Sequence, residues 1–179
     1  MSSSAPLPKV VISTPLGDMT FVIDVNNAPI TGANFLAYVD QGLLKGTSIF
    51  RIVADRNQAD TLPAKIDVVQ FGHRMQGTSY PTPLPAIAHE PTSKTGLRHR
   101  DGTLSMARYA PGTASSSFSI CLGDQPEMDE GGKRQPDGHG FAAFGWIVEG
   151  MDVARALHAK AEDTDMLSQP IPLLDVRRA

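Results

Sequence analysis

The sequence predicts a mainly β protein that folds as an antiparallel barrel or sandwich. Of these two, a closed eight-stranded antiparallel barrel with two helices is favoured. Its short β-rich segments are separated by loops rich in glycine and proline, which number 16 and 14 in the chain. These segments do not alternate regularly with helices, which argues against a parallel α/β sheet. A closed barrel is favoured because closure removes exposed strand edges and side chains can fill the interior. Any functional site would then lie on an outer face or under a loop.

Each predicted strand is a short run enriched in β-branched and aromatic residues and bounded by turn-forming residues. The first two runs flank residues 15–18, Pro-Leu-Gly-Asp, and therefore predict a hairpin. The predicted strands are residues 9–14, 19–25, 48–53, 65–71, 103–108, 117–122, 142–148 and 171–177.

Two helices are predicted. Residues 29–41 carry apolar side chains at three- and four-residue spacing, which indicates an amphipathic helix, and Asn26 and Asn27 are the expected cap. Residues 151–159 form the second helix, with Asp152 in its first turn, where a carboxylate is favourable.

We expect residues 1–8 to be a flexible tail and residues 9–179 to form one domain, because no linker or repeat divides the chain. Three long loops are expected at residues 54–64, 75–100 and 123–140. Long loops in a compact domain are more often functional than idle, so these are candidate walls of a site.

The composition argues against several classes of protein. A net charge of -3 and a pI near 5.9 disfavour a nucleic-acid binder or a protein of anionic membrane surfaces, because both need a basic excess. The single Cys121 excludes an intrachain disulfide framework and a cysteine-cluster zinc site. The histidines show no metal-ligand spacing, so neither a metal nor another cofactor is expected.

The chain also lacks an apolar run long enough to span a bilayer, so no membrane association is expected. It begins without the apolar core of a secretory signal. We therefore expect a cytoplasmic protein, or a periplasmic one if an upstream signal was removed.

Arg51 and Gln70 are polar residues inside otherwise apolar strands. In residues 49–53, Ile-Phe-Arg-Ile-Val, regular alternation would place Arg51 on the same face as Ile49 and Val53. Each polar side chain could simply point to solvent or pair with a neighbour, since charged residues are seldom buried alone. Alternatively, Arg51 is a hydrogen-bond donor beside an apolar pocket and Gln70 anchors the backbone of a ligand. The residues by themselves leave both readings open.

Six segments are informative as an ordered set. They are TPLGDMTFVIDVNNAPITGANFLAY at residues 14–38, GTSIFRIV at 46–53, VVQFG at 68–72, GTLSMA at 102–107, SSSFSIC at 115–121 and GHGFAAFGWIVEGMDVAR at 138–155. Together they resemble the cyclophilin family of peptidyl-prolyl cis-trans isomerases, over nearly the whole chain. Each segment alone is a moderate signal, and the shared order makes the resemblance specific.

The resemblance implies a cyclophilin-like eight-stranded antiparallel barrel capped by two α-helices. It also implies isomerisation of X-Pro peptide bonds and a role in protein folding, without a cofactor. Arg51 would be catalytic, because a donor aimed at the prolyl nitrogen stabilises the twisted amide more than the planar one. Gln70 would share this catalytic role by holding the substrate backbone. The expected partners are proline-containing peptides or unfolded proteins, and the chain is expected to be a monomer.

The resemblance further implies a peptide-binding groove, in which two phenylalanines usual in the family are replaced. Asp67 and Ser119 stand where the family usually has phenylalanine, which predicts a smaller and wetter proline pocket. A catalytically weak peptide-binding or chaperone-like module is therefore the alternative, and an Arg51 held by Asp67 would favour it. The predicted substrate-binding residues are Asp67, Val68, Met106, Ala107, Arg108, Ser117, Phe118, Ser119, Met128 and Phe141.

Overall fold

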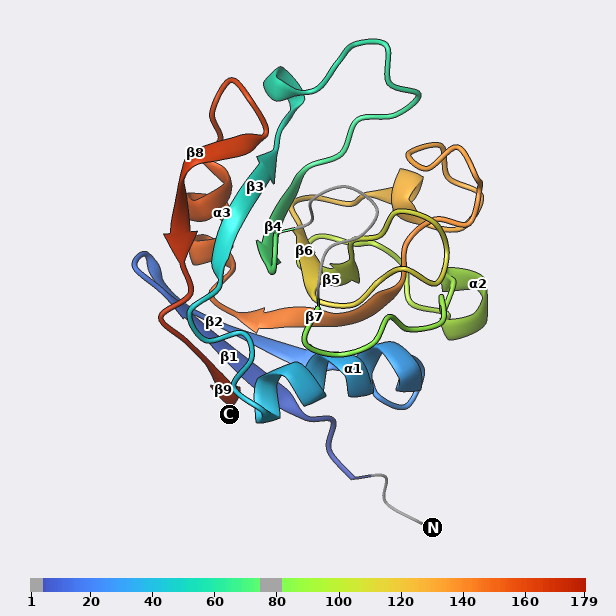
Figure 1. Ribbon diagram of the computed structural model, residues 1–179. Coiled ribbons are helices and arrows are strands. Elements are labelled where there is room, and N and C mark those ends of the chain that lie inside the picture. The colour runs from blue at the N-terminus through green and yellow to red at the C-terminus, as the bar shows by residue number, and fades with distance from the viewer. Residues whose placement is uncertain (1–4, 75–81) are drawn as a thin grey trace.

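The computed structural model describes residues 5–74 and 82–179, which form one curled antiparallel sheet with helices packed against it (Figure 1). Within these residues the sheet has nine strands in the order β8-β3-β4-β6-β5-β7-β2-β1-β9. The strands are β1 (Lys9–Thr14), β2 (Gly17–Ile23), β3 (Ser48–Val53), β4 (Val68–Gly72), β5 (Thr103–Met106), β6 (Ser117–Cys121), β7 (Ala143–Glu149), β8 (Met166–Pro172) and β9 (Asp175–Arg178). The helices are α1 (Pro29–Asp40), the short α2 (Thr92–Thr95) and α3 (Met151–His158), with 3₁₀ turns η1 (Asp55–Asn57) and η2 (Pro126–Met128). The predicted mainly β, barrel-like antiparallel fold class is confirmed.

The chain between β8 and β9 joins the two ends of the sheet. β8 pairs with β3 and β9 pairs with β1, so consecutive strands occupy the two ends of the strand order. Between them, the backbone N–H of Leu173 donates to the carbonyl of Thr47 at 2.9 Å. The next N–H, of Leu174, donates to the carbonyl of Ser13 at 2.8 Å. The connecting residues therefore form hydrogen bonds with both ends of the sheet, next to β3 on one side and in β1 on the other.

Some element bounds differ from those expected. The strand predicted at 171–177 is divided between β8 and β9, because its first residues pair with β3 and its last residues pair with β1. The apolar patterns at 65–71 and 103–108 extend beyond the paired backbone of β4 and β5. The short helix α2 lies in the predicted loop 75–100, of which residues 75–81 are outside the described residues.

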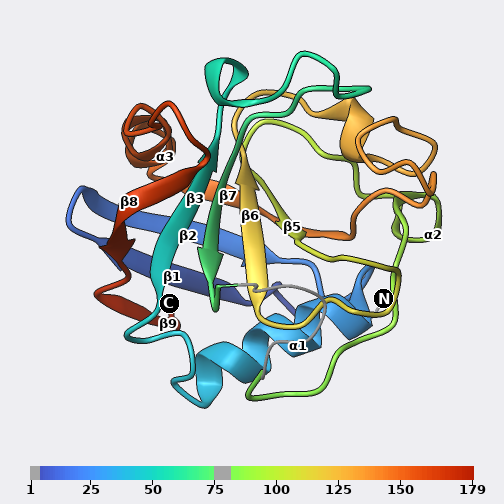
Figure 2. The ribbon, with the colours of Figure 1, turned by 45° about the horizontal axis from the view of Figure 1, so that its top comes forward.

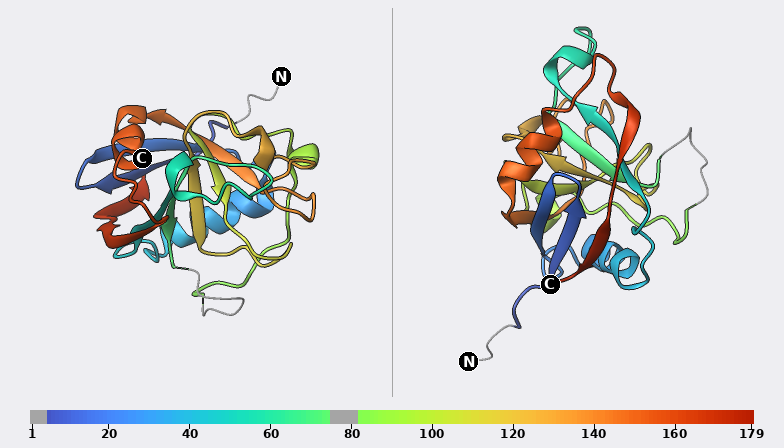
Figure 3. Two further views of the ribbon diagram at one scale, coloured as in Figure 1. Left: turned by 90° about the horizontal axis from the view of Figure 1, so that it is seen from above. Right: turned by 90° about the vertical axis from the view of Figure 1, so that its left-hand side faces the viewer.

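The two longer helices lie on opposite sides of the curled sheet, as Figure 2 and Figure 3 show. Helix α1 contacts β7 and β9, and α3 contacts β2 and β4. The expected cap of α1 by Asn26 and Asn27 is wrong, since Ala28 occupies the cap position without a side-chain hydrogen bond. Instead, the buried carboxylate of Glu90 accepts the N–H of Thr31 at 2.6 Å, which satisfies a free donor of the first turn.

Aromatic rings fill the interior of the barrel. Phe35 of α1 packs against Phe118 of β6 and Phe144 of β7, with ring centroids 5.0 and 5.3 Å apart. Phe71 of β4 lies 5.5 Å from Phe118. All four side chains are buried, so one aromatic cluster ties α1 to three strands. Phe118 was predicted to bind substrate, but alternation along β6 directs it into this core instead.

We expect Phe118→Ala to lower the free energy of unfolding by about 3–5 kcal/mol, because it removes a buried ring and leaves a cavity among three others. Urea denaturation followed by circular dichroism measures this change. Phe50→Leu is the comparison variant: it lies at a pocket-lining position and keeps an apolar side chain, so its loss of unfolding free energy should be smaller. A loss below about 1 kcal/mol for Phe118→Ala would contradict its central place in the core.

Candidate functional site

A pocket of about 410 Å³ opens beside β3, β4, β5 and β6. The strands contribute its base, and segments from the long loops contribute its walls. The predicted site residues in its lining are Arg51, Val68, Gln70, Met106, Ala107, Arg108, Ser119, Met128 and Phe141. The lining residues that the sequence analysis missed are Phe50, Leu62, Ile66, Tyr109, Arg134, Gln135 and Met166.

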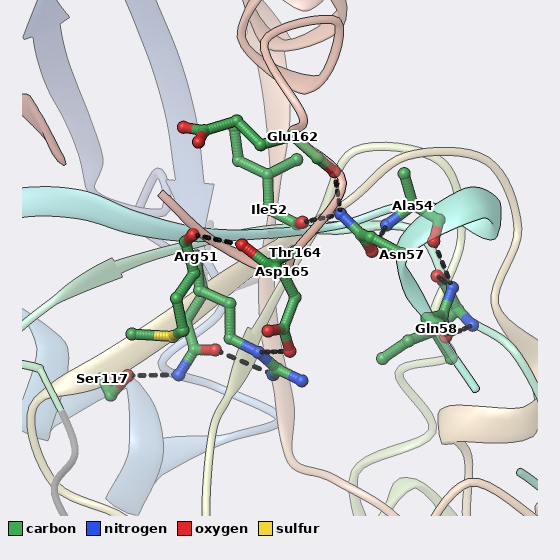
Figure 4. Close-up of polar contacts among 12 residues, drawn as sticks. Arg51, Ile52, Ala54, Asn57, Gln58, Ser117, Glu162, Thr164 and Asp165 are labelled. Atoms are coloured by element: carbon green, nitrogen blue, oxygen red, sulfur yellow. Dashed lines mark hydrogen bonds and ion pairs between the residues drawn. The ribbon is translucent and has the colours of Figure 1, made fainter. Parts of the chain in front are cut away.

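Arg51 and Gln70 are cross-strand neighbours in the β3–β4 pair. Nη1 of Arg51 donates to Oε1 of Gln70 at 3.1 Å, and Nε2 of Gln70 donates to Oγ of Ser117 at 2.7 Å (Figure 4). Ser117 does not line the pocket as predicted, because it is buried beneath Gln70. Its hydroxyl instead orients the Gln70 amide, so that the amide oxygen faces Arg51.

A β-bulge turns Arg51 toward the pocket. The register of β3 shifts between Ile49 and Arg51, against both β4 and β8. Ile49 and Ile52 both pack in the main core, whereas Arg51 lines the pocket. The prediction that Arg51 and Ile49 share a face is wrong, because the extra residue of the bulge interrupts the alternation.

A carboxylate that the sequence analysis missed also holds Arg51. Nε of Arg51 donates to Oδ2 of Asp165 at 2.8 Å, and the backbone carbonyl of Asp165 accepts the N–H of Ile52 at 2.9 Å (Figure 4). The Arg51 and Asp165 side chains are 29% and 35% exposed, so the ion pair borders solvent. Nη2 of Arg51 makes no hydrogen bond to the described residues, so both of its N–H groups are without a partner there. Asp165 is 114 residues from Arg51, in an acidic stretch where no local pattern distinguishes it.

The apolar part of the pocket is a small cluster separate from the aromatic core. Ile66, Val68 and Met128 pack together there, with Phe141 against them. Ser119, across from Gln70 in the β4–β6 pair, lines the same pocket. A hydroxyl at this position adds a polar group to the lining and leaves space that a larger apolar side chain would fill.

The structure does not place Asp67 in the pocket. Its carboxylate lies 3.3 Å from Nε2 of His158 in α3, beside a separate depression. The reason is strand alternation, since Val68 follows directly and faces the pocket. Ile66 occupies the pocket on the other side of Asp67, so the lost phenylalanine is partly replaced by an aliphatic side chain. Arg51 is accordingly held by Asp165 and not by Asp67.

Arg108 fixes the loop that forms one wall. Nη1 and Nη2 of Arg108 donate to the two carboxylate oxygens of Asp137 at 2.9 and 3.0 Å, and Nε donates to the carbonyl of Gly140 at 2.9 Å. Its guanidinium also lies 5.4 Å from the ring centroid of Phe141. The hydrogen bonds from Arg108 and from the N–H of His139 lower the pKa of Asp137 to about 2. Because the Arg108 side chain is occupied in this way, mainly its backbone remains for a ligand.

Two further observations concern metals and membranes. Among the residues in 5–74 and 82–179, no group of three or more His, Cys, Asp and Glu side chains is arranged to hold a metal ion. In the same ranges, none of the helices has the length and apolar character needed to cross a bilayer.

Comparisons with known proteins agree with this architecture. The profile of the family described as "Cyclophilin type peptidyl-prolyl cis-trans isomerase/CLD" matches residues 9–178. Peptidyl-prolyl cis-trans isomerase A of Dickeya dadantii is 31% identical over 150 residues, which cover 81% of this chain and 68% of that protein. A peptidyl-prolyl cis-trans isomerase of Streptomyces antibioticus is 29% identical over 168 residues, which cover 93% of each chain.

Solved structures show the same fold. A cyclophilin-type isomerase of Cryptosporidium parvum has a TM-score of 0.71 at 19% identity, and the match covers 97% of this chain and 98% of that one. A second structure of that type, determined in the presence of the dipeptide Ala-Pro, has a TM-score of 0.70 at 21% identity.

We expect the Arg108–Asp137 pair to make stability depend on pH below about 4. The folded pKa of Asp137, about 2, lies below its ordinary value of 3.8, so its contribution is complete above that value and is lost as the pH falls toward 2. The difference in unfolding free energy between the native chain and Asp137→Asn should therefore shrink over this range, as measured by urea denaturation. Asp163→Asn, at an exposed position, is the control. A difference that does not vary with pH would contradict the pairing.

Proposed function

We propose that Arg51 and Gln70 catalyse, in the pocket described above, the reaction of the family to which this chain belongs. The family is that of the cyclophilin-type peptidyl-prolyl cis-trans isomerases, and the reaction is the isomerisation of peptide bonds that precede proline. The observation that carries the proposal is the donor geometry of Arg51. Its Nε and Nη1 are held by Asp165 and Gln70, while Nη2 is left for a ligand. Such a fixed donor needs little reorganisation when substrate binds.

Arg51 acts on the prolyl nitrogen. In the planar amide the nitrogen lone pair is delocalised into the carbonyl group, and rotation about the bond ends this conjugation. The twisted nitrogen then accepts a hydrogen bond that the planar nitrogen cannot accept. A guanidinium donor at that point stabilises the transition state more than the ground state, which is the requirement for catalysis. The reaction moves no proton and forms no covalent intermediate.

Gln70 and the apolar cluster position the substrate. Gln70 is buried and its amide is fixed by two hydrogen bonds, so it presents a defined polar edge to the backbone of a peptide. The proline ring lies against Val68, Met128 and Phe141, whose apolar surfaces line the pocket. The bound ring then cannot follow the rotation of the preceding residue, and the twist is confined to one bond. The substrates are accordingly proline-containing peptides and unfolded chains.

The chain acts as a monomer in this proposal, since Arg51, Gln70 and the apolar cluster lie together in one pocket and the reaction needs no residue of a second chain. Protein folding is the process it serves, because the unaided isomerisation takes tens to hundreds of seconds.

We expect Arg51→Ala to lower kcat/KM for short X-Pro peptides by about 100-fold or more, because it removes the donor that stabilises the twisted amide. NMR exchange measurements of the cis-to-trans rate test this. Arg155→Ala removes an exposed arginine of α3 and should leave the rate unchanged. Equal rates for the native chain and Arg51→Ala would overturn the role of Arg51. If the folded native chain accelerates nothing, the peptide-binding module becomes the better account.

We expect Asp165→Ala to lower kcat by about tenfold while KM changes little, because Arg51 loses the acceptor that orients its Nε. Asp165→Asn keeps an acceptor oxygen and should recover most of the rate. The same NMR exchange assay separates the two variants over a range of peptide concentrations. A fall in both variants alike would show that the charge of Asp165, and not its position, is what matters.

A further inference from the structure

Of the three arginines that line the candidate active site, Arg134 makes no ion pair with the described residues. Arg134 lies in the loop that ends at Phe141 and borders the same pocket as Arg51. It is partly buried, whereas the neighbouring Lys133 is exposed. No carboxylate of the described residues lies within ion-pair distance of Arg134. The other two arginines of the pocket differ in this respect, since Arg51 is paired with Asp165 and Arg108 with Asp137.

The Arg134 side chain is held firmly by neutral groups. Nη1 donates to Oε1 of Gln58 at 2.8 Å and to the carbonyl of Ala64 at 3.0 Å. Gln58 is itself fixed, because its side chain bonds the N–H of Ile66 at 3.0 Å and the carbonyl of Ile66 at 2.7 Å. The guanidinium is therefore oriented by the loop before β4, and its position does not depend on solvent contacts.

The remaining donors of Arg134 are available. In the described part of the chain, Nε and Nη2 of Arg134 make no hydrogen bond. If Arg134 served only to connect the two loops, the two hydrogen bonds made by Nη1 would be sufficient. Its position in the pocket lining adds something that a connecting role does not require, namely free donors beside the groove where a peptide would lie.

The electrostatics of the pocket favour an incoming negative charge. Burial and the positive charge of Arg51 lower the pKa of Arg134, and the nearby Asp165 raises it. The guanidinium nevertheless stays charged at neutral pH, because arginine is effectively never deprotonated in proteins. A partly buried cation with no carboxylate in direct contact is less stable than one that is paired directly. A ligand that supplies a carboxylate would therefore gain from meeting Arg134.

We propose that Arg134 is a specificity-determining residue that selects peptides carrying a carboxylate, from Asp or Glu, next to the proline. The proposal rests on the function proposed above and extends it to a substrate class. The free Nε and Nη2 edge of a guanidinium matches the two oxygens of a carboxylate, so both can be engaged together. Peptides with a neutral amide at the same position would leave the cation unpaired.

The test uses peptides with both ends blocked, each with one proline and either Glu or Gln before or after it. Blocked ends ensure that the Glu side chain is the only carboxylate. NMR exchange gives kcat/KM, and titration by chemical shift gives the dissociation constant, for the native chain, Arg134→Gln and Lys133→Gln. We expect the native chain to prefer one Glu peptide over its Gln partner by about tenfold, since hydrogen bonds between charged groups contribute at least that factor.

Arg134→Gln should lose this preference, so that each Glu peptide and its Gln partner give equal kcat/KM values and equal dissociation constants. Lys133→Gln removes the same charge one residue away, at an exposed position, and should keep the preference. A peptide with neutral residues and a free carboxyl end, compared with its amide, shows whether a chain terminus satisfies Arg134 equally well. Equal values for Glu and Gln peptides in the native chain, or an unchanged preference in Arg134→Gln, would overturn the proposal.

The binding measurement separates this proposal from the proposed function. If no peptide is isomerised but Glu peptides still bind more tightly through Arg134, the catalytic role of Arg51 fails and the selection by Arg134 is supported. If isomerisation is normal and charge has no effect on rate or binding, the selection fails and the catalytic role is unaffected. Binding of no peptide at all would overturn both.

Discussion

Antiparallel pairing of β3 with β4, and of β4 with β6, aligns Arg51, Gln70 and Ser119 across three neighbouring strands. The same pairing places the aromatic core on the other side of the sheet, with Phe71 opposite Phe118. A shift of one residue in this register would exchange the two faces, so the core and the site are fixed by the same hydrogen bonds. The bulge in β3 is the necessary exception, because it turns Arg51 toward the pocket while Ile49 and Ile52 stay in the core.

Hydrogen bonds to arginine then fix the loops around this base. Arg108 binds the loop that carries Asp137 and Gly140, and Arg134 connects the same region to Gln58 and Ala64. Loops are usually the mobile part of a domain, and a site built on them needs such anchoring to keep its geometry. Arg134 uses only Nη1 for this anchoring, and the guanidinium groups of both Arg108 and Arg134 lie beside the pocket. The groups that hold the walls thus also set the charge of the site.

The apolar pocket is modest compared with the one expected from aromatic side chains. Ser119 gives it a polar edge, while Ile66 supplies aliphatic surface that compensates in part for the missing phenylalanine. In the proposed binding mode, the apolar contact with the proline ring contributes correspondingly less binding free energy, because this contribution grows with the apolar area buried. Polar and charged contacts to the rest of the peptide gain relative weight in such a pocket. This balance favours recognition of the residues around proline as well as of proline itself.

The sequence by itself determined the fold class, most of the strands, and Arg51 and Gln70 as the central polar pair, because strand periodicity and the ordered family segments are local in the chain. It also indicated that the long loops would border the site. Only the tertiary structure placed Asp165 beside Arg51, turned Asp67 toward His158 and put Phe118 in the core. It alone brought Arg134 to the pocket through Gln58, 76 residues away. These contacts depend on a bulge, on one-residue alternation and on loop paths, and such features are decided by packing between segments distant in sequence.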